Sequence, residues 1–321
     1  MNDVENKSSI QLEKDLNGII KNSMPNQILK MNYTNPRVLF HMINILNNQD
    51  IKDLFTDEQW DELMNNIDES LKSEENRLEY VFEMMRYSLA KTEDWNKSIE
   101  ELLSKNPDTT IILKEFAVPV LLVIEELLKE QNCTFSDICI CGTGSYSVVY
   151  KIGNRILKLG DKRKVSYVIN SDKILQPILK KDLNGKKFAM TIEVTNRVKL
   201  FTDDEYEEND EKIEEILYEI WKELMDEGII WTDPRIENIG ILLSDNIQTL
   251  DGEPLYVDPD SIKVSHRIET LRKKGEVVVI DIDFLFSKSD LNIKVGSSLY
   301  WKFKERYKKE KNKHNVEYNN K

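Results

Sequence analysis

The spacing of apolar residues divides the chain into a helical first part and a second part that is richer in strands. Up to about residue 130, apolar residues recur at intervals of three and four, as over 54–71 and 80–89, which is typical of amphipathic helices. Thr56 and the pair Asn35-Pro36 predict the starts of two of these helices. From Ile138 onward, short apolar runs predict strands.

Residues 138–159 predict three strands joined by two turns, and the third strand carries Lys158. The first turn is made of small residues: Gly142, Thr143, Gly144, Ser145 and Ser147. The backbone N–H groups of such a loop can contact a polyphosphate, and a lysine on a nearby strand can pair with phosphate charge. The alternative is an ordinary hairpin loop beside a solvent-exposed lysine.

The rest of the chain mixes strands and helices. The predicted elements are strands at 174–179 and 187–194, a hinge at 195–197, an acidic linker from 203, a helix over 213–225, a strand at 239–243, a loop or hairpin insertion over 245–274, one buried strand over 276–286 and a short helix from 301 that frays into a polar tail. The strand over 276–286 carries Asp281 and Asp283. Two buried carboxylates in an apolar strand are costly unless a divalent metal or a basic side chain compensates them.

Composition narrows the function classes. The 321 residues carry a net charge of −13, and no basic domain stands out, which argues against nucleic-acid binding. No segment has the length and apolarity of a membrane span or of a signal peptide, so no membrane association is expected. The three cysteines, Cys133, Cys139 and Cys141, are interpreted as reduced thiols in a cytoplasmic protein. His41, on an apolar stripe, is interpreted as a core histidine.

The stretch W-T-D-P-R-I-E-N holds the strongest candidate chemistry. Asp233 and Asn238 are five residues apart, with Arg235 between them, and an apolar run follows. A phosphotransfer loop has this layout: the carboxylate faces the attacking hydroxyl, the cation offsets phosphate charge, and the amide binds a metal. The alternative is ordinary turn chemistry, which Asp-Pro and Asn also provide.

The glycine-rich hairpin, the strand lysine, the D-x-x-x-x-N loop and the strand-end Asp281 occur in the order found in kinases. Over about residues 138–290, the chain resembles the protein-kinase-like fold superfamily, which also contains the aminoglycoside and choline kinases. The resemblance implies a two-lobed α+β fold within a kinase-like domain at 132–321. Its antiparallel N-lobe sheet would span about 138–195 and its reduced helical C-lobe about 196–310. An all-α domain at 1–131 precedes it and is a candidate site for a protein partner.

The resemblance also implies a role for each matching residue. ATP and Mg²⁺ are the expected cofactors, with Asp233, Arg235 and Lys158 as the catalytic residues and Asn238, Asp281 and Asp283 as metal ligands. The nucleotide would contact Gly142, Thr143, Gly144, Ser145, Ser147, Val149, Lys158, Glu193 and Thr195. The expected reaction moves the γ-phosphoryl group of ATP to a hydroxyl of a protein or small molecule.

Several features depart from the family pattern. Trp231-Thr232 stands where the usual His-Arg precedes the catalytic aspartate, and no activation segment follows Asp281. The helix that carries the usual glutamate partner of the lysine is missing, and we hypothesise that Glu125 or Glu126 replaces it. Asp258 is a second candidate for the metal-binding aspartate. Alternative functions are a pseudokinase that acts through its helical domain, the transfer of AMP, and a helical interaction protein with an unrelated α+β domain.

Overall fold

The protein is described by a computed structural model that covers residues 7–31, 33–47, 49–91, 107–144, 147–160, 174–183, 186–202, 210–252, 266–280, 285–287 and 296–319. It is a mixed α+β structure with antiparallel sheets and a helical N-terminal region, as predicted. The chain forms two compact units. Unit 1 comprises Met1–Arg163 and Lys173–Val194, and unit 2 comprises Lys164–Asp172 and Thr195–Lys321. The helical region and the strands that follow it therefore share unit 1.

The helices of unit 1 begin where the sequence places caps. Asn35 accepts hydrogen bonds from the backbone N–H groups of Arg37 and Val38, and Thr56 forms a reciprocal capping box with Gln59. The helices are α1 (Ser9–Lys21), α2 (Pro25–Ile28), α3 (Pro36–Leu46), α4 (Gln49–Lys52), α5 (Asp57–Ser70), α6 (Glu74–Lys91) and α8 (Pro107–Gln131), and the 3₁₀ turn η1 (Phe135–Asp137) follows.

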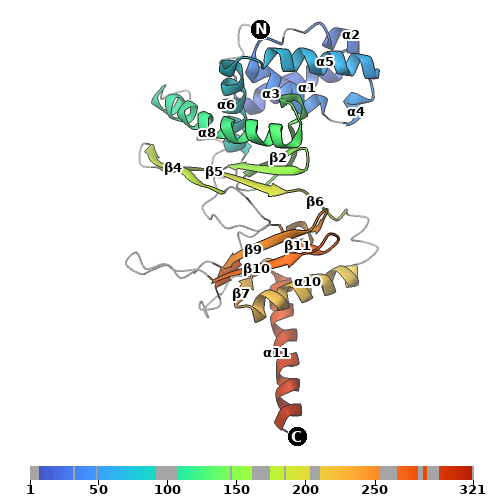
Figure 1. Cartoon of the computed structure of the whole chain (residues 1–321), viewed down its shortest axis with the longest axis vertical. Helices are drawn as coiled ribbons and strands as arrows, with labels where there is room; N and C mark the ends of the chain where they lie inside the picture. Colours follow the sequence, from blue (N-terminus) through green and yellow to red (C-terminus); the bar gives the residue numbers. More distant parts are fainter. Residues whose placement is uncertain are drawn as a thin grey trace. The chain divides into compact units, whose positions relative to one another are not determined.

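A five-stranded sheet completes unit 1, with strand order β1-β2-β3-β5-β4. The strands are β1 (Cys139–Thr143), β2 (Ser147–Ile152), β3 (Arg155–Gly160), β4 (Ile174–Leu183) and β5 (Lys186–Asn196). The helices of this unit lie on one side of the sheet (Figure 1). Val148, Tyr150 and Ile152 alternate along β2 and are fully buried, because α6 and α8 pack against this strand.

Unit 2 contains two helices and three small sheets in its described part. The elements are β6 (Val198–Lys199), α10 (Asp210–Asp226), β7 (Ile229–Trp231), η2 (Ile236–Asn238), β8 (Ile239–Leu242), β9 (Asn246–Gly252), β10 (His266–Arg272), β11 (Val277–Val279), β12 (Leu285–Ser287) and α11 (Ser298–Asn319). The strand orders are β11-β8-β6, β10-β9 and β12-β7. Of the two alternatives for the segment 245–274, the described residues form the hairpin, β9 and β10.

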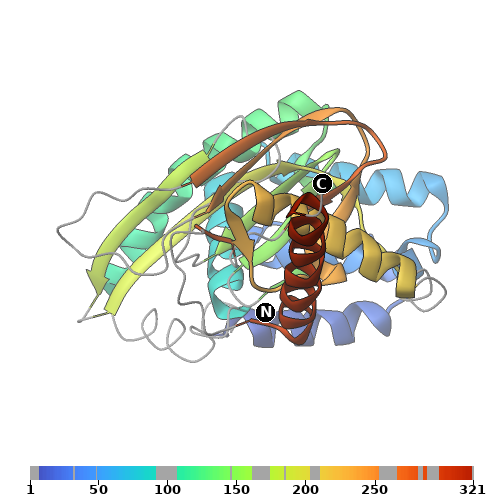
Figure 2. The ribbon, with the colours of Figure 1, turned by 90° about the horizontal axis from the view of Figure 1, so that it is seen from below.

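Aromatic residues join the two helices of unit 2. Trp221 of α10 packs edge-on against Tyr300 and Tyr307 of α11, and its indole N–H donates to the carbonyl of Trp231 at 2.9 Å. The two helices cross each other (Figures 1 and 2). The prediction of a short, fraying C-terminal helix was wrong, because α11 continues to Asn319. Intrahelical ion pairs such as Arg306–Glu310 and contacts with α10 support this length.

Candidate functional site

The glycine-rich segment forms the predicted hairpin between β1 and β2. The pairing register shifts between Ile140 and Gly142, so β1 contains a bulge, and the N–H of Gly144 donates to the carbonyl of Ser147 at 2.8 Å. Neither glycine has a positive φ angle, and a Cβ atom at either position would make only ordinary contacts. The fold itself therefore does not require glycine at either position. Ser145 lies outside the described residues.

Lys158 lies inside the sheet, next to this hairpin. It pairs with Val149 across β2 and β3, and its Nζ is 3.4 Å from Oε1 of Glu193 on the neighbouring strand β5. The two side chains are only 15% and 6% exposed, so the alternative of a solvent-exposed lysine was wrong. The resemblance implied that Glu193 contacts the nucleotide, and this ion pair with Lys158 was not predicted. Glu125, one of the two proposed partners of Lys158, contacts Arg77 at 2.7 Å instead.

The D-x-x-x-x-N loop connects β7 to β8 and turns through the 3₁₀ helix η2. Asp233 and Asn238 are both buried, and the side-chain amide of Asn238 donates to the backbone carbonyl of Asp233 at 3.0 Å. The Nε of Arg235 donates to Oδ1 of Asp233 at 2.7 Å, while most of the Arg235 side chain remains exposed. The loop thus holds the carboxylate and the amide at one place, with a cation beside them.

The segment predicted as one strand over 276–286 forms two strands with different partners. β11 pairs with β8, which follows the loop, and β12 pairs with β7, which precedes it. The prediction of one continuous strand was wrong in this respect. Between them, the N–H of Ile280 donates to the carbonyl of Asn238 at 2.9 Å. Asp281 and Asp283, and likewise the alternative ligand Asp258, lie outside the described residues.

The predicted site residues belong to both units. The hairpin, Val149, Lys158 and Glu193 are in unit 1, whereas Thr195 and the loop from Asp233 to Asn238 are in unit 2. The boundary between Val194 and Thr195 falls at the segment predicted as a hinge. Each group of predicted site residues is therefore described by the contacts within its own unit.

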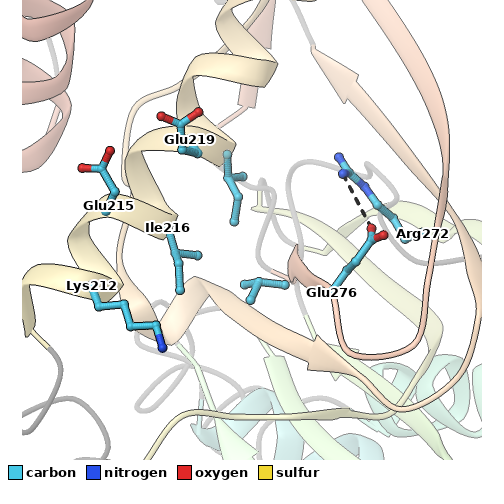
Figure 3. Close-up of a pocket in the computed structure, with 8 residues that line it drawn as sticks. Lys212, Glu215, Ile216, Glu219, Arg272 and Glu276 are labelled. Atoms are coloured by element: carbon cyan, nitrogen blue, oxygen red, sulfur yellow. Dashed lines mark ion pairs between the residues drawn. The ribbon is translucent and has the colours of Figure 1, made fainter.

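Unit 2 also carries an open groove of about 430 Å³ between α10 and the β10–β11 region (Figure 3). Its residues are Lys212, Glu215, Ile216, Glu219, Ile220, Arg272, Glu276 and Val277. The Arg272–Glu276 pair crosses its edge at 4.0 Å (Figure 3), and Arg272 also contacts Glu223 at 2.6 Å. None of the predicted site residues lines this groove.

The described residues contain no group of three or more His, Cys, Asp or Glu side chains placed to hold a metal ion. Within the same ranges, no helix combines the length and apolarity needed to cross a bilayer. The chain matches no protein-family model, and neither the curated proteins nor the solved structures gave a match.

Proposed function

We propose that the chain is an ATP-dependent phosphotransferase of the protein-kinase-like superfamily, which moves the γ-phosphoryl group to a hydroxyl acceptor. One observation carries the proposal: one hydrogen bond closes the loop, and a second joins it to the segment that follows β11 and leads into Asp281. Asn238 donates its amide to the Asp233 carbonyl, and its own carbonyl accepts from Ile280. Chain connectivity then keeps Asp281 one residue away from the second bond.

The donor set fits a magnesium nucleotide. The Asn238 amide oxygen and the carboxylate of Asp281 are the hard oxygen ligands that Mg²⁺ takes, and these two residues would hold the ion. When bound, Mg²⁺ neutralises charge on the transferring phosphate. In unit 1, the glycines at 142 and 144 leave the hairpin backbone open to a phosphate. Lys158 would contact the α- and β-phosphates after exchanging part of its interaction with Glu193.

Asp233 would orient the acceptor hydroxyl. Its Oδ1 is occupied by Arg235, whereas Oδ2 has no hydrogen-bond partner among the residues that the structure describes. A carboxylate oxygen that is available in this way can accept the hydroxyl proton as the bond to phosphorus forms. Arg235, whose side chain is 60% exposed, can reorient toward phosphate without breaking core contacts.

Two measurements test the proposal. The first is the thermal shift with ATP, with and without Mg²⁺. The second is ³²P transfer from γ-labelled and from α-labelled ATP to a basic protein, an acidic protein, an aminoglycoside and the chain itself. Transfer of the γ label supports a kinase, and transfer of the α label identifies AMP transfer. A shift without transfer favours the pseudokinase, and no shift at all argues against a nucleotide site.

Matched variants assign the chemistry to the loop. Asp233→Asn keeps the side-chain shape and should lower γ-phosphoryl transfer on the order of a hundredfold or more, with ATP binding retained. Asp245→Asn is the control, because this exposed aspartate follows β8 and, among the described residues, contacts Lys273 and the N–H of Lys274. Equal rates in the two variants would remove Asp233 from the mechanism.

A further inference from the structure

Unit 1 contains a cavity of about 200 Å³ that the phosphotransfer chemistry does not use. Its wall combines residues of α1, α3, α4, α6 and β1. The polar members that matter are Glu13, Asn17, Lys21, His41 and Tyr87. The cavity therefore has both polar and apolar lining residues and is built where four helices meet the first strand of the sheet.

Three of these residues follow one another along α1 at intervals of four, so they share one face of the helix. Glu13 is already engaged, because it accepts from Tyr87 Oη at 2.9 Å and lies 3.1 Å from Lys91 Nζ. Asn17 differs, because its Oδ1 is buried and has no hydrogen-bond partner among the described residues. Lys21 is exposed, and no ion pair joins it to an acidic side chain among the residues that the structure describes. The wall thus offers one unused acceptor and, about 6 Å further along the helix, one unused cation.

We propose that this cavity binds a small carboxylate that carries an N–H or O–H donor beside its carboxyl group, as amino acids and hydroxy acids do. The carboxylate contacts Lys21, and the donor satisfies Asn17 Oδ1. A buried acceptor without a partner costs about 1–3 kcal/mol, which a bound donor relieves. The spacing of four residues suits a ligand whose two groups are separated by a few bonds, since the flexible lysine side chain spans the remainder.

The part of the wall that α3 contributes is held in place by hydrogen bonds and ion pairs. The His41 ring lines the cavity, and its Nε2 lies 2.9 Å from Oε1 of the fully buried Glu83. Glu83 also binds Arg37 at 2.8 Å and Ser9, so α1, α3 and α6 are joined through one carboxylate. A ligand entering this cavity meets a preorganised wall, which lowers the entropic cost of binding.

The cavity also reaches the glycine-rich hairpin. Ile140 of β1 lines it, and the N–H of Ile140 donates to Oδ1 of Asn44, another lining residue, at 3.0 Å. Ile140 stands directly before the bulge that leads into Gly142. If the proposed phosphotransfer function holds, an occupant would therefore alter nucleotide affinity through β1. Binding itself does not depend on that function.

The test uses the full chain and measures binding without ATP. The probes are the twenty common L-amino acids, L-lactate and L-malate, each at about 5 mM, and acetate serves as the probe that lacks a donor. A probe present at roughly a hundred times its Kd raises the melting temperature by several degrees, and titration calorimetry then gives its Kd. We expect at least one donor-bearing carboxylate to bind and acetate to have no effect.

Asn17→Leu keeps the size of the side chain and removes the acceptor, and Lys21→Met keeps its length and removes the charge. Each should weaken binding of that probe about tenfold or more. Lys14→Met, an exposed change on the same helix outside the cavity, is the control and should bind as the wild type does. The proposal is overturned if no probe binds, if acetate binds equally well, or if Lys21→Met retains wild-type affinity. Since Lys21 is exposed, that last variant does not depend on an intact core.

Discussion

The buried carboxylate of Glu83 makes a sharp prediction about stability. It is fully inaccessible to solvent, accepts from Arg37 Nε at 2.8 Å and contacts His41 at 2.9 Å, with Arg86 at 4.0 Å. Glu83→Gln keeps the shape and removes the negative charge. The two arginine side chains are only 13% and 14% exposed, so the change removes the carboxylate that faces this buried positive charge.

Breaking a buried charge network in this way costs about 3–5 kcal/mol. For a unit of about 150–250 residues, that corresponds to a fall in melting temperature of about 6–20 °C. The matched control is Glu79→Gln, one turn earlier on α6, where the 40% exposed carboxylate contacts Lys114. An exposed pair of this kind contributes less than about 1 kcal/mol.

Urea unfolding followed by circular dichroism measures both variants. Hydrogen exchange shows whether the loss is confined to α3 and α6 or extends to α10 of unit 2. If the free energy of unfolding of Glu83→Gln lies within about 1 kcal/mol of that of Glu79→Gln, the carboxylate does not hold the three helices together and the reasoning fails.

The carboxylate of Glu83 should also make the stability of the protein depend on pH. Burial alone would raise the pKa of Glu83, but the hydrogen bond to His41 and the positive charge of Arg37 lower it below its ordinary value of 4.5. A lowered folded-state pKa means that the stabilisation is present above pH 4.5 and is lost as the pH falls through the folded-state pKa. The stability difference between the wild type and Glu83→Gln should therefore shrink as the pH falls into the acid range. A difference that does not shrink would contradict the lowered pKa.

Three further substitutions test the packing. Gly240→Ala should destabilise unit 2, because the new Cβ would lie 2.3 Å from Cγ2 of Val198. Gly18→Ala, inside α1 with nothing within 4 Å of the new Cβ, should instead stabilise unit 1 by up to about 1 kcal/mol. Thermal melts in which both substitutions change the melting temperature in the same direction would refute this reasoning. Tyr150→Phe should cost about 1–2 kcal/mol, because the buried hydroxyl lies 2.9 Å from Ser88 Oγ, and an unchanged urea midpoint would contradict it.

The features that the sequence predicted correctly are local. The caps at Asn35 and Thr56 depend on hydrogen bonds to residues two or three positions away, so a short stretch of sequence contains all the chemistry they need. The hairpin of β1 and β2 likewise has its small residues and its alternating strands within one short segment.

The features that the sequence did not predict depend on partners far along the chain. Apolar periodicity predicts strand structure in the segment 276–286, but it does not predict that β11 pairs with β8 whereas β12 pairs with β7. The contact between Lys158 and Glu193 joins residues on separate strands, and no local pattern identifies the pair. The cavity wall is formed by residues of α1, α3, α6 and β1, which are far apart in the sequence, so no local pattern predicts it.

Hydrogen bonds between the helices and the sheet show that the N-terminal helical region supports the strands of unit 1. Asn44 of α3 binds the backbone of β1, and Ser88 of α6 binds Tyr150 of β2. Val148 and Ile152 are buried on the same face of β2 as Tyr150, and burying each such side chain contributes about 1.5–3 kcal/mol. The helices therefore supply the core on which the glycine-rich hairpin rests. A ligand or partner that acts on the helices has a direct physical route to β1 and β2, without passing through unit 2.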